Sequence, residues 1–184
     1  MQLLKERFQK EIRPALQKEL KLSSLEATPK MVKITVNTSS KDFKTDKDFT
    51  AKTKAWLGLI TGQLPVERRS KNSIAAFNLR ENDIVGLKVT LRGDRMYDFF
   101  QKLTSIVLPR LKDFQGVSRN TFDQNGNYSL GLSEQIVFPE VEYDKIGRIQ
   151  GLQIVISTSA VDAKSGEILL EKLGMPFTKE NNKQ

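Results

Sequence analysis

The chain has 184 residues, of which 38% are apolar, and its 30 basic and 22 acidic residues give a formal net charge of +8. It contains no cysteine and no histidine, so disulfides, thiol nucleophiles and thiolate zinc sites are excluded, and the commonest general base and metal ligand are missing. No apolar run approaches the ~20 residues of a membrane span. These features favour a soluble, non-enzymatic protein, and the length predicts one domain over residues 1–178 with a frayed tail at 179–184.

The charge is unevenly distributed along the chain. Residues 1–65 carry a net charge of +6, residues 66–120 carry +5, and residues 121–184 carry −3. This asymmetry predicts a basic side that faces an anionic partner such as nucleic acid. An ordinary basic protein with solvated lysines is the alternative.

The first elements are a helix and a strand. Apolar residues spaced by four predict an amphipathic helix over residues 2–21, with a distortion at Pro14. A strand follows, in which Val32, Ile34 and Val36 face the core. The residues that alternate with them form a polar, partly basic face: Lys33, Thr35 and Asn37.

A second helix and a hairpin come next. Thr45 and Asp48 resemble a capping box that opens a helix, and Gly62 closes it. A short strand over residues 64–69 then leads into a polar loop at about 70–84, which returns on another strand. Loops of this length are often functional, so we expect the loop to project from the hairpin.

The strand after the loop is the clearest element of the sequence. Three residues point to one side (Leu87, Val89 and Leu91) and three to the other (Lys88, Thr90 and Arg92). Gly93 ends the strand, and apolar residues at helical spacing predict a helix over residues 96–107. A polar strand face that carries cations suits an anionic partner.

The last third of the chain is rich in turn-forming residues. Residues 125–127 (Asn-Gly-Asn) predict a tight turn, residues 152–156 a final strand, and residues 168–173 a closing helix before Gly174. Strands interspersed with helices predict an α+β, two-layer fold, with a mostly antiparallel sheet, helices on one face and a nucleic-acid-binding outer face.

Motifs for catalysis, nucleotide binding or metal binding are absent from the sequence, so neither a cofactor nor a metal is expected. Asp94 and Asp98 stand in the first turn of a predicted helix, where carboxylates favour the helix dipole. The remaining alternative is a small α+β enzyme that acts on an anionic substrate, with Arg92, Arg95 and Asp94 as its site.

Seven motifs occur in order along the chain. They are Ile60-Thr61-Gly62-Gln63-x-Pro65, Lys71-x-Ser73-Ile74-Ala75-x-Phe77, Gly86-x-Lys88-Val89-Thr90-Leu91-Arg92-Gly93-Asp94-Arg95-Met96, Leu108-Pro109-Arg110, Asp113-Phe114-x-Gly116, Phe122-Asp123-x-x-Gly126-Asn127-Tyr128-Ser129-Leu130-Gly131 and Glu134-Gln135-Ile136-Val137-Phe138-Pro139-Glu140. Together they resemble one known family, the bacterial-type large-ribosomal-subunit protein five that docks 5S ribosomal RNA. The resemblance covers essentially the whole chain and implies a non-enzymatic protein of the ribosome in the cytoplasm.

The resemblance implies that 5S rRNA sits on the outer face of the sheet, beside large-subunit rRNA. The positions that match the family's contacts are Asn37, Gln63, Thr90 and Arg92, and the strand alternation adds Lys33, Thr35 and Lys88. Arginine and lysine bind phosphate, while amides and hydroxyls reach phosphate, ribose or base edges. Filling an exposed strand face is the alternative role for the threonines and asparagine.

Two further contacts follow from the resemblance. The loop would reach transfer RNA in the peptidyl site through Lys71, Asn72, Ser73, Ile74 and Arg80, while Phe77 is expected to pack against the loop's own stem. Residues 122–130 would lie near the small-subunit ribosomal protein thirteen, although a plain hairpin explains the turn there equally well.

The chain departs from the family at two places. Residues 37–41 read Asn-Thr-Ser-Ser-Lys, where the family usually has Asn-Met-Gly-Val-Gly. In the loop, Asn72 and Ala76 replace a second basic residue and a glycine. Since glycine permits positive φ and close approach of RNA, these changes predict an altered segment after the first strand and a stiffer, less cationic loop tip.

Overall fold

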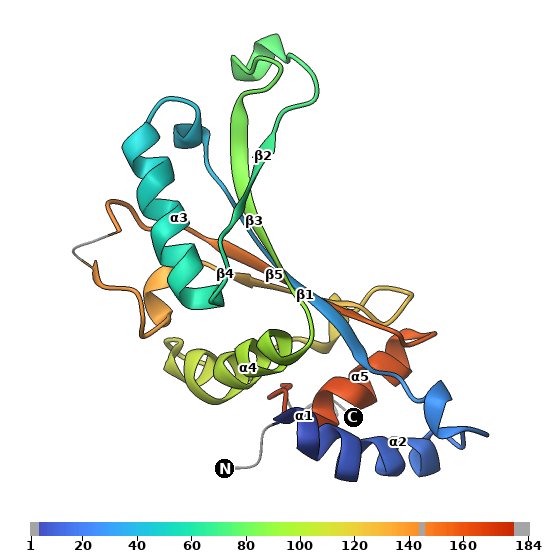
Figure 1. The fold of residues 1–184 in the computed structure, drawn as a ribbon. Coiled ribbons are helices and arrows are strands. Elements are labelled where there is room, and N and C mark those ends of the chain that lie inside the picture. Colours follow the sequence, from blue (N-terminus) through green and yellow to red (C-terminus); the bar gives the residue numbers. More distant parts are fainter. Residues whose placement is uncertain (1–3, 144–145, 179–184) are drawn as a thin grey trace, which may run out of the picture. The chain divides into compact units, whose positions relative to one another are not determined.

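The computed structural model describes residues 4–143 and 146–178, so the predicted tail at 179–184 lies outside the described residues. Five strands form one sheet in the order β2-β3-β1-β5-β4, which together with the helices gives the predicted α+β fold (Figure 1). The strands are β1 (Met31–Ser39), β2 (Val66–Arg69), β3 (Ile84–Leu91), β4 (Tyr128–Leu132) and β5 (Leu152–Thr158). Among the described residues, no helix is both long and apolar enough to cross a membrane.

The chain divides into two compact units. Unit 1 contains residues 1–34, 92–130 and 155–184, and unit 2 contains residues 35–91 and 131–154. Short 3-10 turns connect the larger elements; they are η2 (Leu25–Ala27), η3 (Lys41–Phe43), η4 (Ala75–Phe77), η6 (Leu108–Arg110), η7 (Arg119–Thr121) and η8 (Gln135–Val137).

The amino-terminal helix of unit 1 consists of three pieces. They are α1 (Leu4–Arg7), the π-helical turn η1 (Phe8–Ile12) and α2 (Arg13–Glu19). Pro14 occupies the first turn of α2, directly after the π turn, where its missing N–H breaks no regular helical bond. The distortion expected at Pro14 is therefore present as this π turn.

Two further helices of unit 1 match the periodicity of the sequence. Helix α4 (Asp94–Lys102) continues into the π turn η5 (Leu103–Val107), and its predicted apolar stripe is buried: Met96, Phe99, Phe100, Leu103 and Val107. Helix α5 (Ala163–Lys172) begins earlier than predicted because the Asp162 carboxylate accepts a hydrogen bond from the Ser165 N–H at 3.3 Å and caps it. Residue Gly174, at φ 97°, follows this helix as expected.

Strand β1 alternates as predicted except at its start. Ile34, Val36 and Thr38 are buried, whereas the prediction that Val32 faces the core is wrong, because its side chain is 45% exposed. Met31 is buried in its place. Since Met31 and Ile34 are three residues apart, the regular two-residue alternation begins only at Ile34.

Helix α3 (Lys47–Thr61) covers β3 within unit 2. Its cap is Asp46, whose carboxylate accepts from the Phe49 N–H at 2.9 Å, so the predicted capping box at Thr45 is wrong by one residue. The helix buries Trp56, Leu57 and Ile60, and it ends at Gly62 in the left-handed conformation, as predicted.

A buried amide network joins Gln135, Arg148 and Gln150 to α3. The Gln135 side chain is fully buried; it donates to the Arg148 carbonyl at 2.7 Å and accepts from the Gln150 N–H. The Thr53 hydroxyl of α3 lies 3.1 Å from the Gln150 side-chain oxygen. These bonds satisfy both ends of the Gln135 side-chain amide, which would otherwise be costly to bury.

Candidate RNA-binding surfaces

The first candidate surface is the polar face of β1 and β3. On β3, Leu87, Val89 and Leu91 are buried, while Lys88 and Thr90 between them are half-buried. On β1, Thr35 and Asn37 alternate with buried residues in the same way. Because β1 and β3 are neighbours in the sheet, the four polar side chains share its less buried face. We call these residues, with Arg68 described below, the polar sheet face.

Two further cations belong to unit 1: Lys33 lies on β1, and Arg92 directly follows the end of β3. Lys33 is half-buried and Arg92 is exposed. Within the part of the chain that the structure describes, Lys33, Lys88 and Arg92 form no ion pair. Cations that the protein itself leaves unneutralised are available for phosphate.

Arg68 joins this surface, although sequence reasoning missed it. Strand β2 pairs antiparallel with β3, and Val66 stands opposite Lys88, so these two side chains point to the same face. Arg68 lies two residues further along β2 and is exposed. The intervening Glu67 instead accepts hydrogen bonds from Lys54 of α3 and, at 2.9 Å, from Arg69. The sequence shows charged residues in succession along β2, with Arg68 among them. The direction of the Arg68 side chain follows only from the register of β2 with β3.

Gln63 stands apart from the strands in the connection between α3 and β2. Its backbone carbonyl accepts from the Thr61 hydroxyl at 3.0 Å, which fixes the turn after Gly62. The side chain is half-buried and forms no hydrogen bond within the described residues. It therefore retains both its amide donors and its carbonyl acceptor for a partner.

Gly86 lets β3 approach β1 closely. A Cβ atom at this position would lie 2.7 Å from the Thr38 carbonyl oxygen, closer than a carbon and an oxygen can approach. The Thr38 hydroxyl, in turn, donates to the Gly151 carbonyl at 2.9 Å. Gly86 thus fixes the spacing between the two strands that carry the polar sheet face.

The loop at residues 70–83 is the second candidate surface, and it extends the β2–β3 hairpin (Figure 1). Hydrogen bonds between Ser70 and Asp83 (2.9 Å) and between Ile74 and Leu79 (2.9 Å) tie its two sides together. Asn78 and Asn82 adopt positive φ, which asparagine tolerates. The loop is therefore an ordered hairpin tip.

The predicted loop residues play different parts in this tip. Lys71 and Arg80 are exposed and form no ion pair within the described residues. The Ser73 hydroxyl accepts from the Glu81 N–H at 3.0 Å, and the Asn72 carbonyl accepts from the Ser70 hydroxyl at 2.7 Å. Ser73 and Asn72 thus shape the tip, while Lys71 and Arg80 supply its charge.

Phe77 contradicts the sequence prediction. It was expected to pack against the stem of the loop, yet its side chain is 73% exposed, and Ile74 is 42% exposed. Phe77 belongs to the 3-10 turn η4, in which no residue is buried. The apolar character of Phe77 does not by itself indicate which way its side chain points.

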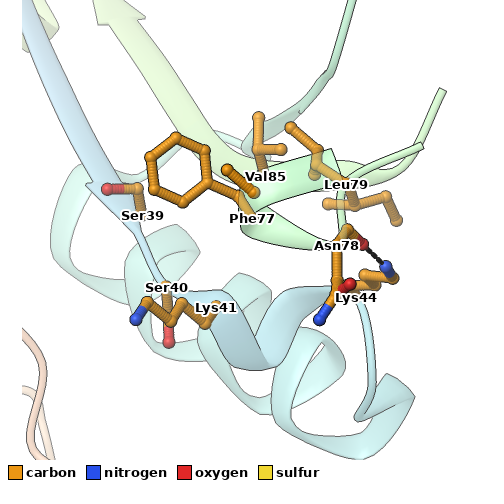
Figure 2. Close-up of a pocket in the computed structure, with 10 residues that line it drawn as sticks. Ser39, Ser40, Lys41, Lys44, Phe77, Asn78, Leu79 and Val85 are labelled. Carbon is orange, nitrogen blue, oxygen red and sulfur yellow. Dashed lines mark hydrogen bonds between the residues drawn. The ribbon is translucent and has the colours of Figure 1, made fainter. Parts of the chain in front are cut away.

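A lysine outside the loop holds the tip in place. The Lys44 ammonium donates to the Asn78 carbonyl and lies 3.4 Å from the Asp83 carboxylate. The Arg80 N–H donates to the same carboxylate at 2.8 Å, and this bond, followed by Lys44, lowers the pKa of Asp83. Figure 2 shows Lys44 against Asn78 at one end of a pocket in unit 2.

Residues 122–130 form the hairpin that the turn signal predicted. The Asp123 carboxylate accepts from the Asn127 side-chain amide (2.8 Å) and from the backbone N–H groups of Asn127 (2.7 Å) and Asn125 (3.0 Å), and these bonds lower its pKa. Phe122 pairs with Tyr128 across an antiparallel bridge. The Tyr128 hydroxyl donates to the Ser118 carbonyl at 2.9 Å. The residues that remain exposed at the turn are Asp123, Gln124 and Asn125.

The alternative enzyme site lacks an acid–base arrangement. Asp94 begins α4 and pairs with Lys5 at 2.5 Å, and both side chains are largely exposed. No group of three or more potential metal ligands occurs in the described part of the chain. The geometry therefore gives Asp94 a structural ion pair with Lys5.

Comparisons with known proteins decide between these alternatives. Residues 26–80 match the family model described as Ribosomal protein L5, and residues 84–177 match the model that describes the C-terminus of the same ribosomal family. The chain belongs to the ribosomal protein L5 family. This result confirms the resemblance carried by the seven motifs.

Curated relatives support the same assignment over almost the full length. The "Large ribosomal subunit protein uL5" of Chloroflexus aurantiacus is 50% identical over 174 residues, which are 95% of this chain and 97% of the relative. The proteins of the same name from Chloroflexus aggregans and Limosilactobacillus reuteri are each 48% identical, over 95% and 96% of this chain and 97% and 98% of the relatives.

Membership of this family makes the chain a structural constituent of the large ribosomal subunit. It associates with ribosomal RNA, takes part in translation and works in the cytoplasm, where ribosomes are found. It is not an enzyme, so the reading of Arg92, Arg95 and Asp94 as a catalytic site is wrong.

Proposed function

We propose that the polar sheet face binds 5S ribosomal RNA and thereby anchors the RNA to the large subunit. Unpaired cations of adjoining strands carry this proposal: Lys88 and Arg68 lie on the face itself, Lys33 lies on β1, and Arg92 directly follows β3. Each cation that neutralises a phosphate of the RNA backbone releases counterions on binding, which favours the complex.

The neutral side chains of the surface supply contacts of a different kind. Thr35, Asn37, Thr90 and Gln63 form no hydrogen bonds from their side chains within the described residues. A hydroxyl or amide on a rigid strand can bind a ribose 2′-hydroxyl or a base edge, which phosphate-binding cations cannot read. The cations thus account for affinity and the neutral groups for the choice of RNA.

A binding assay with purified 5S rRNA tests this proposal. The variant Lys88→Ala with Arg92→Ala removes two unpaired cations from the strands, and we expect it to weaken binding by ~2–6 kcal/mol, at about 1–3 kcal/mol for each contact. The matched control, Lys10→Ala with Lys164→Ala, removes the same charge from exposed helical positions. Equal losses in the two variants would show that only net charge matters.

The loop at residues 70–83 reaches a second RNA, the peptidyl-site transfer RNA. Lys71 and Arg80 support this part of the proposal because both are exposed, unpaired within the described residues and held on an ordered tip. Residues 122–130 are proposed to meet the small-subunit ribosomal protein thirteen through the exposed side of their turn, at Asp123 to Asn125. Crosslinking in assembled ribosomes tests both contacts.

A further inference from the structure

A pocket of about 580 Å³ lies between the loop tip and the segment that follows β1 (Figure 2). All of its lining residues belong to unit 2. Phe77, Leu79, Ile84 and Val85 give it an apolar wall. The other side is lined by Ser39, Ser40, Lys41 and Lys44. Its volume is within the range of ~300–1,000 Å³ that is typical of small-ligand sites.

Phe77 is the reason to expect a flat aromatic ligand. All ten phenylalanines lie in the described part of the chain, and Phe77 is the only exposed one. Its ring extends over the pocket toward Ser39, as Figure 2 shows. An aromatic ring held at the wall of a pocket offers its face for stacking on a nucleobase.

The rim of the pocket carries the polar groups that a nucleotide needs. The Ser39 hydroxyl and the Asn78 side-chain amide form no hydrogen bond within the described residues, so both retain their donors and acceptors. Lys41 is exposed and unpaired there as well. Ser40 is unavailable, because its hydroxyl accepts from the Asp42 N–H at 3.2 Å.

The pocket is formed before any ligand arrives. Lys44 joins its two sides through the Asn78 carbonyl and the Asp83 carboxylate, and the Ile74–Leu79 bridge closes the tip behind Phe77. Ligand binding therefore need not order the loop, and less of the stacking energy is lost to conformational entropy.

We propose that this pocket holds one unpaired nucleobase of the RNA that the loop contacts, with Phe77 stacked on the base and Lys41 on an adjacent phosphate. The proposal rests on the proposed contact of the loop with RNA and specifies its chemistry. Ser39, Lys41 and Ala76 stand where the family usually has glycines, and all three line this pocket. Their side chains can therefore face the nucleotide.

The test compares two probes that differ in one base. The first is a short RNA duplex with a single bulged adenosine, and the second is the same duplex with an abasic residue at the bulge. The full chain should bind the first at least about fivefold more tightly, since one stacked base contributes that factor or more. The ring resonances of Phe77 should shift upfield only with the adenosine probe.

Three variants of the pocket and one control variant make the result specific to the pocket. Phe77→Leu should lose the preference for adenosine, Phe77→Trp should retain it, and Lys41→Ala should weaken binding of both probes equally. Tyr143→Leu, which removes an exposed aromatic ring elsewhere in unit 2, should change neither affinity. If Phe77→Leu keeps the preference, or if the wild-type chain has none, the pocket proposal is overturned while the loop–RNA contact stands. Failure to bind either probe overturns both.

Discussion

The ammonium nitrogen of Lys44 lies 3.4 Å from a carboxylate oxygen of Asp83, and this contact joins the segment after β1 to the end of the projecting loop. Both side chains are only partly exposed, and the same lysine also binds the Asn78 carbonyl. A loop tip with mostly exposed residues has few apolar contacts of its own. The position of the tip therefore depends on the polar contacts of Lys44 with Asp83 and Asn78, which we call the latch.

We predict that acid opens the latch. The Arg80 N–H and then Lys44 hold the pKa of Asp83 below its ordinary value of 3.8. Because the folded pKa is depressed, the stabilisation is present above about pH 3.8 and is lost as pH falls through the lowered pKa. Asp83→Asn should mimic the acid state at neutral pH, with faster hydrogen exchange at the Leu79 and Asn82 amides.

The control for the latch is Glu81→Gln, which neutralises an exposed acid of the same loop that has no ion pair in the described structure. It should leave exchange at Leu79 and Asn82 unchanged. Equal acceleration in both variants would mean that the charge of the loop, and not the contact with Lys44, keeps the tip in place.

A second prediction concerns the spacing of β1 and β3. Gly86→Ala would place a methyl group 2.7 Å from the Thr38 carbonyl, so we expect it to lower the free energy of unfolding by about 1–3 kcal/mol. Gly131→Ala is the matched control, because no atom lies within 4 Å of its added Cβ and it should change stability by less than about 0.5 kcal/mol. Urea denaturation measures both; a harmless Gly86→Ala would show that the strands can separate.

Local periodicity was enough to predict the elements that carry the polar sheet face. Strand β3 alternates over six residues and α4 repeats its apolar residues at helical spacing, so burial of Leu91 and Phe100 followed from the sequence alone. Arg68 and Phe77 could not be placed in this way. The direction of Arg68 depends on its register with β3, and that of Phe77 depends on a 3-10 turn within the loop.

The third prediction separates the two faces of β3. Leu91 is fully buried and Arg92 is exposed, so Leu91→Asp should unfold the protein, while Arg92→Ala should keep its thermal midpoint and lose ~1–3 kcal/mol of 5S rRNA affinity. Circular dichroism and filter binding measure the two effects. A stable Leu91→Asp together with an unfolded Arg92→Ala would invert the assignment of the faces.

The fourth prediction is that salt weakens the complex with 5S rRNA. Lys33, Arg68, Lys88 and Arg92 are unpaired within the described residues, and each phosphate contact should contribute slightly less than one unit to the slope of log affinity against log salt. Removing Arg68 by Arg68→Ala should therefore reduce the slope by about 0.7–0.9. A slope that does not depend on salt would refute phosphate neutralisation as the source of affinity.

The last prediction is that the loop is dispensable for 5S rRNA binding. The hydrogen bond from the Ser70 N–H to the Asp83 carbonyl closes the hairpin below the tip, so a short Gly-Ser turn can replace residues 72–82 without disturbing β2 or β3. Thr90 lies seven residues beyond Asp83, and a strand rises ~3.3 Å per residue, so the tip and the polar sheet face are well separated. The affinity for 5S rRNA should change by less than about 0.5 kcal/mol.

Ribosomes that carry this loop replacement should release peptidyl-site transfer RNA faster, because the replacement removes Phe77 and Arg80 from the tip and leaves Lys71 at its base. Dissociation of labelled transfer RNA measures this effect, and Arg92→Ala is the reciprocal control, since it should weaken 5S rRNA binding and leave transfer RNA release unchanged. A folded loop-replacement protein that no longer binds 5S rRNA would contradict the separation of roles. In that case the tip would contribute directly to holding 5S rRNA, together with the cations of the sheet.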